Sequence, residues 1–309
     1  MQSAWKVVAY VFWVAAATAG AYLLMTTHPG KSGALFLARP QAQLWVLALA
    51  VQAGLWAAVA PFLWRTCREF SPATRWGWVG WLLLSAVVVV LFLRLEQARL
   101  YGPGPTYPLA HHGGRLLALT IAGVVLVLGS GILALCLIWH RLRTTAPPDD
   151  WNWPAAGKQA GELLRARERL AQVLLALGLA VGAVTLATGA LRSAVLAYLP
   201  QEATQFPALT PWLFGAGATV VLAAGYFPAY FALQRASRRL VDAIYPLERT
   251  VRPDQNWYAD RTNFIALLKL ETGPVESFRT GVVILAPLLG SLLATLLPTK
   301  LHKALCHHC

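Results

Sequence analysis

Charged side chains are scarce in this sequence. Only 13% of its 309 residues are Asp, Glu, Lys or Arg, whereas 57% are apolar. Soluble domains carry about a quarter charged residues, so a soluble fold of this length would lack the polar surface that it needs. The four cysteines, Cys67, Cys136, Cys306 and Cys309, suggest no disulfide framework. We interpret Cys136, which lies in an apolar run, as a small packed residue.

Catalytic and cofactor motifs are also missing. The stretch 30–32, Gly-Lys-Ser, lacks the upstream glycine of a phosphate-binding loop. No zinc-protease HExxH is present in the sequence. His111 and His112 begin the fourth apolar run and His140 ends it, roughly 40 Å away along a helix, which is too far for axial ligation of one haem. We therefore expect no cofactor and favour a protein without enzymatic activity.

Long apolar runs are the main feature that is present. A bilayer span needs about 20 such residues, and six runs meet this requirement: 5–25, 41–64, 76–94, 115–140, 171–198 and 209–233. A seventh run, 280–298, is shorter and contains Pro287, so it either spans, re-enters or lies at the interface. The sequence predicts an all-α polytopic membrane protein with six transmembrane helices and a candidate seventh at the C-terminus.

The net charge of +13 falls mainly in alternate loops. If the N-terminus is inside, the inside segments hold most of the Lys and Arg residues, as cytoplasmic loops do. This bias predicts a cytoplasmic N-terminus, in what we expect to be a bacterial cytoplasmic (inner) membrane. Because topology accounts for most of the basic excess, we expect the lipid bilayer as a partner and no nucleic acid.

The chain divides into four expected regions. These are a six-helix bundle at 1–234 with a cytoplasmic hairpin at 141–170, a cytoplasmic helical segment at 235–278, a hydrophobic helix at 279–298, and a Cys/His tail at 299–309. Residues 155–172 lack helix breakers after Gly161 and have mixed charge at helical spacings. We expect the fifth helix to extend through them into the cytoplasm.

The segment after the sixth span predicts two helices. A basic stretch continues that span until Pro246 ends it. A short helix is expected near 260–270, with Asp260 as its N-cap. Its apolar stripe would contain Phe264, Leu267 and Leu268.

Polar residues near membrane depth are the first place to look for function, because intramembrane charge is costly. One group is predicted near the outer face: Arg94, Glu96, His111, His112 and Arg192. These side chains either snorkel to water separately or form one outer polar cluster. No carboxylate lies near the middle of any predicted span, which argues against a proton-driven transporter.

Small residues mark two helix faces. Gly178 and Gly182 form a GxxxG pair in the fifth span, and Gly215 and Gly217 lie in the sixth. Such residues permit close helix packing, within the bundle or between subunits. In the last run one face carries small or weakly polar residues: Thr280, Pro287, Ser291 and Thr295. This face either packs against another helix or lines a pore in an oligomer.

The C-terminal tail ends with Cys306, His307, His308 and Cys309. Cys and His at this spacing can bind zinc or another soft metal. A structural site usually draws its ligands from two separated pairs, so an exposed tail is the simpler interpretation.

Three functional hypotheses follow. The first is a non-enzymatic, oligomeric channel, pore or membrane effector that depends on the last helix. The second is a structural or assembly subunit of a larger membrane complex, which the small-residue faces and basic helices suit equally well. The third is a transporter or membrane enzyme that uses the outer polar cluster. Homo-oligomers or membrane partner subunits are expected in the first two cases.

Overall fold

The computed structural model describes residues 2–27, 30–71, 113–145, 153–200, 209–246, 255–268 and 270. Within these ranges the regular structure is helical, with no strand. The helices are α1 (Gln2–Thr26), α2 (Gly30–Leu37), α3 (Pro40–Phe70), α5 (Gly113–Gly123), η1 (Val124–Gly129), α6 (Ser130–Thr144), α7 (Trp153–Tyr198), α8 (Leu209–Ile244) and α9 (Gln255–Leu267). The predicted all-α class is confirmed for this part of the chain.

Among the described residues, five helical segments are long and apolar enough to cross a membrane. They cover Trp5–Thr26, Pro40–Phe70, Gly114–Thr144, Ala155–Tyr198 and Gly215–Ile244. These segments correspond to the first, second, fourth, fifth and sixth predicted runs. The third run, 76–94, and the last run, 280–298, lie outside the described residues, so the total number of spans stays a prediction.

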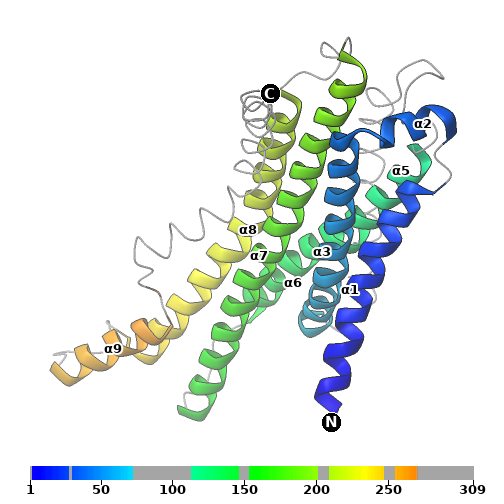
Figure 1. Ribbon diagram of the computed structural model, residues 1–309. Helices are drawn as coiled ribbons and strands as arrows, with labels where there is room; N and C mark the ends of the chain where they lie inside the picture. Colours follow the sequence, from blue (N-terminus) through cyan, green and yellow to red (C-terminus); the bar gives the residue numbers. More distant parts are fainter. Residues whose placement is uncertain are drawn as a thin grey trace, which may run out of the picture.

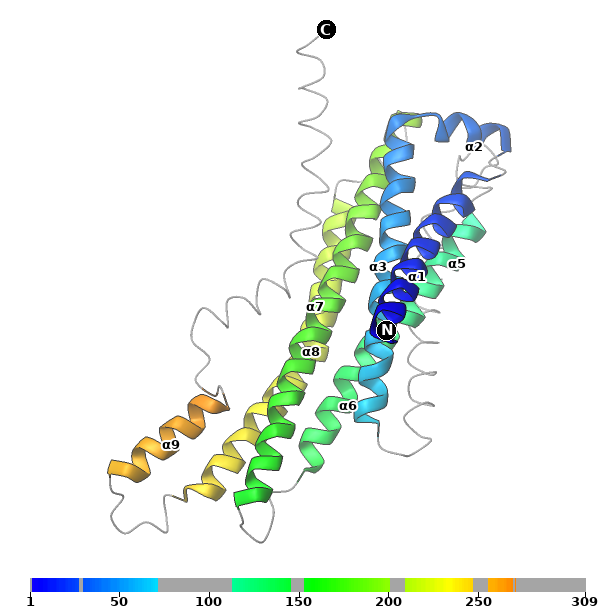
Figure 2. The ribbon, with the colours of Figure 1, turned by 60° about the horizontal axis from the view of Figure 1, so that its bottom comes forward.

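The long helices lie side by side in an elongated bundle (Figures 1 and 2). α3 packs against α1, α6 and α7, while α8 packs against α6 and α7. α3, α6 and α8 run in one direction and α1 and α7 in the other, so the ends of α3, α6 and α8 lie near the start of α7. α9 lies beside this same end of the bundle.

Among the described residues, two apolar clusters form the core. The larger one joins α3, α6, α7 and α8, and includes the fully buried Leu63, Ile138, Leu177 and Leu240. The smaller one lies towards the other end, where Phe36 of α2 packs edge-on against Trp45 of α3, with ring centroids 6.0 Å apart. α1 contributes little to either cluster and exposes large apolar side chains along its length, as a lipid-facing helix does.

Several predicted helix boundaries are confirmed. α7 is continuous over 46 residues, so the fifth span does extend back through 155–172. α8 ends at Ile244, two residues before Pro246, because proline disfavours helical geometry in the residue before it. The fourth predicted span is also one continuous helix, in which a π-helical segment, Val124–Gly129, joins α5 to α6. The apolar pattern of the sequence does not predict this π-helical segment.

The predicted start of the short helix after α8 is wrong. α9 begins at Gln255, five residues before the proposed N-cap Asp260, which lies inside the helix. Trp257 explains the earlier start, because its ring packs edge-on against Tyr245, with centroids 6.0 Å apart. The predicted stripe also changes: Phe264 and Leu268 contact the core, but Leu267 is exposed and Ile265 takes its place.

Cys136 needs a second correction. It lies in an apolar helix, but its side chain is exposed on the surface of α6 and is not packed in the core. An apolar run gives a helix without saying which of its faces is buried. Of the two described cysteines, Cys67 is the buried one, and its Sγ donates to the Ser130 carbonyl at 3.2 Å, joining α3 to α6.

Candidate functional site at the basic end of the bundle

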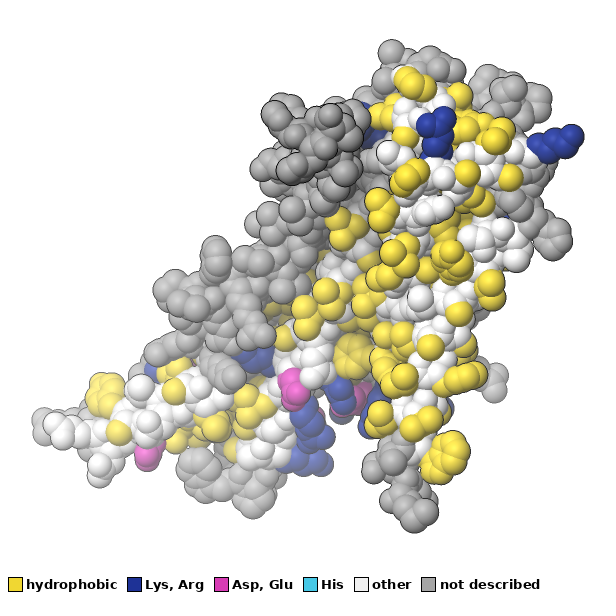
Figure 3. Space-filling model, viewed as in Figure 1, with side chains coloured by type: hydrophobic (Ala, Val, Ile, Leu, Met, Phe, Trp, Pro, Cys, Tyr) yellow, Lys and Arg dark blue, Asp and Glu magenta, His cyan; other side chains and the backbone are white. Residues whose placement is uncertain are grey.

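One end of the bundle is strongly basic. We define this basic end as residues 65–70, 140–145, 153–172, 234–246 and 255–268, which come from α3, α6, α7, α8 and α9. It holds twelve Lys or Arg residues against five Asp or Glu residues. Figure 3 shows these side chains gathered near the lower end of the molecule, below a largely hydrophobic surface over α1 and α3.

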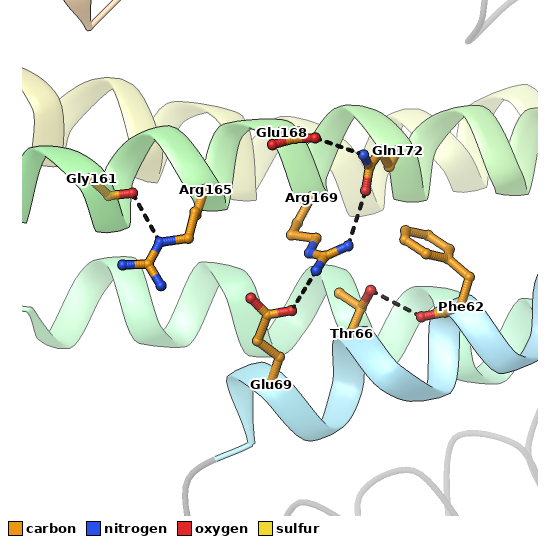
Figure 4. A network of polar contacts seen from close by, with 8 residues as sticks. All are labelled: Phe62, Thr66, Glu69, Gly161, Arg165, Glu168, Arg169 and Gln172. Atoms are coloured by element: carbon orange, nitrogen blue, oxygen red, sulfur yellow. Dashed lines mark hydrogen bonds and ion pairs between the residues drawn. The ribbon is translucent and has the colours of Figure 1, made fainter. Parts of the chain in front are cut away.

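An ion pair joins two of the helices at this end. Arg169 Nη2 of α7 lies 3.1 Å from Glu69 Oε2 of α3 (Figure 4). The same guanidinium donates to Gln172 Oε1 at 3.2 Å, and Gln172 Nε2 donates to Glu168 Oε1 at 3.0 Å. Arg169 also lies over the Phe62 ring, 5.9 Å from its centroid. The shared contacts fix the orientation of Arg169 between α3 and α7.

α9 is attached to the basic end by both apolar and polar contacts. Leu268, directly after the helix, is only 2% exposed. Arg167 Nη1 of α7 donates to the Leu268 carbonyl at 2.9 Å. Arg261 Nη2 of α9 lies 3.2 Å from Asp242 Oδ1 of α8, and its guanidinium lies 5.9 Å from the Trp257 ring centroid. α9 is therefore tied to both α7 and α8.

Tyr245 lies at the junction between α8 and α9. Its ring contacts Trp257 and Phe264 of α9, with centroids 6.0 and 6.1 Å away. Burial, and secondly the negative charge of Asp260, raise the pKa of the Tyr245 hydroxyl above its ordinary value. The contact thus favours the neutral phenol.

α7 is longer than a bilayer span requires. A helix of 46 residues is about 69 Å long, against a hydrocarbon core of about 30 Å. Residues 170–191 carry no charge, and they would cover about 33 Å. A bilayer span at residues 170–191 would leave the preceding part of α7, from Trp153 to Arg169, outside the hydrocarbon core.

The predicted outer polar cluster can be traced only at Arg192. This residue lies near the end of α7 opposite the basic end, and it is half-buried. Arg94, Glu96, His111 and His112 lie outside the described residues. The neighbouring Arg115 of α5 donates to the carbonyls of Leu24 and Thr27, at the end of α1, which is a capping role for an exposed basic side chain.

Two further predicted sites, the last-helix face and the C-terminal metal site, cannot be placed in the structure. The last-helix face, Thr280, Pro287, Ser291 and Thr295, lies outside the described residues, as does the tail with Cys306, His307, His308 and Cys309. Within the described ranges, no group of three His, Cys, Asp or Glu residues comes together to hold a metal ion. The pore face and the metal site both remain predictions.

The four predicted packing glycines behave differently from one another. Gly178 and Gly215 are buried, but a methyl group added at Gly182 or Gly217 would meet no atom within 4 Å. Close packing within the chain occurs instead at Gly131, where an added methyl group would overlap the side chain of Leu177. Gly182 and Gly217 have open space beside them within the chain. That they pack against another subunit stays a prediction.

Two polar residues were missed by sequence reasoning. Glu69 is the first acidic residue in the sequence. The scarcity of acidic residues among many basic ones was the signal that could have indicated its ion pair. Gln52 is 6% exposed in the apolar middle of α3, and its Oε1 has no hydrogen-bond partner among the described residues. The signal for Gln52 was a single strongly polar residue between positions 44 and 64.

Comparison with protein-family models, with curated proteins and with solved structures finds no match for this chain. The chemistry of the basic end must therefore be judged from its own residues. Exposed guanidinium groups on a helical scaffold can bind carboxylates or phosphates.

Proposed function

We propose that this chain is a non-enzymatic integral membrane protein that serves as an assembly subunit, and that its basic end binds an acidic surface of a partner protein. The observation that supports this most strongly is the continuous α7. It joins an uncharged segment of bilayer length to a charged extension that Glu69, α8 and α9 hold in place. A rigid extension of this kind is suited to recognition, since little ordering is required upon binding.

The charge pattern favours an acidic partner over a second copy of this end. Seven more basic than acidic side chains lie in the described basic end, so two such surfaces would repel each other. Complementary charge accelerates encounter and suppresses wrong partners. Several of the basic side chains are exposed and unused by the ion pairs of the bundle, including Arg68, Lys158 and Arg165.

The same charge pattern supports a cytoplasmic location for the basic end. Only Lys31, Arg39, Arg115 and Arg192 carry charge at the opposite end of the described helices. By the positive-inside rule, the basic end and the N-terminus of α1 lie in the cytoplasm. A bacterial inner membrane is the location that we propose with this topology.

Photocrosslinking in intact membranes tests the proposal. A photoreactive amino acid is placed at position 165, and a matched control is placed at the exposed Lys31 on the opposite end. We expect a discrete protein adduct from position 165 only. Charge reversal by Arg68→Glu and Lys158→Glu should lower its yield, and so should high salt. No protein adduct at position 165, or an adduct unchanged by charge reversal, would refute the assembly function.

The alternative pore or membrane-effector function rests on the face with Ser291 and Thr295, for which the described residues offer no support. Purified protein in liposomes distinguishes the two proposals. Ion flux that Ser291→Leu abolishes would favour the pore.

A further inference from the structure

A groove of about 430 Å³ lies between α6 and α8 at the basic end, on a different surface from the Glu69–Arg169 ion pair. Its volume falls within the range of small-molecule sites, about 300–1,000 Å³. α6 and α8 supply the lining residues: Trp139, Leu142, Arg143, Pro228, Phe231, Ala232, Arg235, Ala236 and Arg239.

Among the described residues, the charged part of the groove contains three arginines and no acidic residue. Arg143, Arg235 and Arg239 are all exposed, and none forms an ion pair with another described residue. Asp242, the nearest acidic residue along α8, pairs with Arg261. Three guanidinium groups that have no counter-charge among the described residues favour an anion.

The remaining part of the groove is apolar. From Pro228 to Arg239 the lining runs along α8 for about 16 Å, and its character changes from apolar to basic in that direction. Phe231 is 53% exposed and stacks on Phe227, with ring centroids 6.2 Å apart. This continues the apolar surface along α8, away from the arginines.

Trp139 marks the level at which the two parts meet. Tryptophan favours the headgroup region of a bilayer, and Trp139 lies in the groove with Arg143 over its ring, 5.5 Å from the centroid. A free phosphate would use the arginines alone. A lipid with an anionic headgroup would use the arginines and the apolar surface together, as basic pockets between membrane helices do.

We propose that the α6–α8 groove binds one anionic phospholipid, with its phosphate on Arg143, Arg235 and Arg239 and an acyl chain along Phe231 and Phe227. This inference does not depend on the proposed assembly function, because the crosslinking variants there change none of these residues.

Native mass spectrometry of the purified full chain tests the site. The protein in detergent is titrated with phosphatidylglycerol, with phosphatidylcholine and with inorganic phosphate as separate probes. We expect one tightly retained phosphatidylglycerol, little phosphatidylcholine and no displacement by inorganic phosphate. Arg235→Gln with Arg239→Gln should weaken phosphatidylglycerol binding roughly thirty-fold.

Arg238→Gln is the matched control, because Arg238 is exposed on the same helix but does not line the groove. It should leave lipid binding unchanged. Arg239→Lys keeps the charge and should retain most binding, which separates loss of the site from loss of the fold. Equal binding of the two lipids, displacement by inorganic phosphate, or a Gln double variant that binds like the control would each overturn the proposal.

Discussion

Arg169 of α7 and Glu69 of α3 form an ion pair at 3.1 Å although 100 positions separate them in the sequence. Their side chains are 27% and 35% exposed, so water screens the pair in part. The pair lies where α3 ends and where the uncharged segment of α7 begins. It therefore joins the end of α3 to the point on α7 where the charged segment meets the uncharged one.

Breaking this pair should weaken the attachment of α3 to α7. We expect Glu69→Gln and Arg169→Gln each to lower the free energy of unfolding by about 1 kcal/mol, with the double variant losing less than the sum. Unfolding by SDS titration in mixed micelles measures this. Glu162→Gln is the control on α7, since Glu162 forms no ion pair among the described residues. Fully additive losses would contradict a direct interaction.

The attachment of α9 can be tested at two adjacent leucines. Leu268 is 2% exposed and Leu267 is 54% exposed. Leu268→Ala should cost about 2–5 kcal/mol of packing, which is enough to release α9 from the bundle, whereas Leu267→Ala should have little effect. Amide hydrogen exchange over residues 255–267 measures the release. Equal exchange in the two variants would show that α9 is not held by Leu268.

A pH dependence follows from Tyr245. Its pKa is raised in the folded protein, so the contact with α9 is fully present below the unfolded value, near 10, and is lost as pH rises through the folded value. We expect hydrogen exchange in α9 to accelerate only at strongly alkaline pH. Tyr245→Phe should remove this response, and Asp260→Asn should lower the pKa of Tyr245. An unchanged alkaline response in Tyr245→Phe would assign it to another group.

Alanine substitution at Gly131 and at Gly182 should change the stability of the bundle differently. Gly131→Ala should destabilise the bundle by about 1–3 kcal/mol, because the added methyl group overlaps Leu177. Gly182→Ala meets no neighbour, so it should leave stability unchanged or raise it by up to about 1 kcal/mol through helix propensity. SDS unfolding measures both, and the reverse order would mean that the α6–α7 packing is different.

The Gly182→Ala variant also tests whether this glycine packs between subunits of an oligomer. If the GxxxG face joins subunits, this variant should shift the protein towards monomer in light scattering while its unfolding free energy is preserved. An unchanged mass would leave Gly182 with no packing role between identical subunits.

The apolar runs predicted the long helices of the described residues, but they did not predict which helices pack against one another. Uncharged runs such as 170–191 predict bilayer helices directly, because length and apolarity decide that outcome. Pro246 likewise predicted the end of α8 through backbone geometry alone. Which helices touch depends on side-chain packing over long sequence separations. For that reason no local sequence pattern predicts the Glu69–Arg169 ion pair. Only the absence of acidic residues before Glu69 pointed to it.

Two sequence predictions were wrong: which face of α6 is buried, and the residue at which α9 begins. Cys136 was placed inside because its neighbours are apolar, but in a membrane helix the lipid-facing side is apolar as well, so composition cannot separate the two sides. Asp260 is a reasonable N-cap residue in isolation. The tertiary contact between Trp257 and Tyr245 nevertheless extends α9 by earlier residues.

The central claim is that one continuous helix, α7, carries both a bilayer span and the projecting basic end. Spin labels at positions 165 and 186 test it most directly, in protein whose four native cysteines have been replaced. The two positions are exposed on the described surface and lie about 31 Å apart along α7. In reconstituted membranes, we predict that label 165 is relaxed by a water-soluble nickel chelate and label 186 by oxygen dissolved in lipid. Nickel access at both positions, or oxygen access at both, would contradict the account.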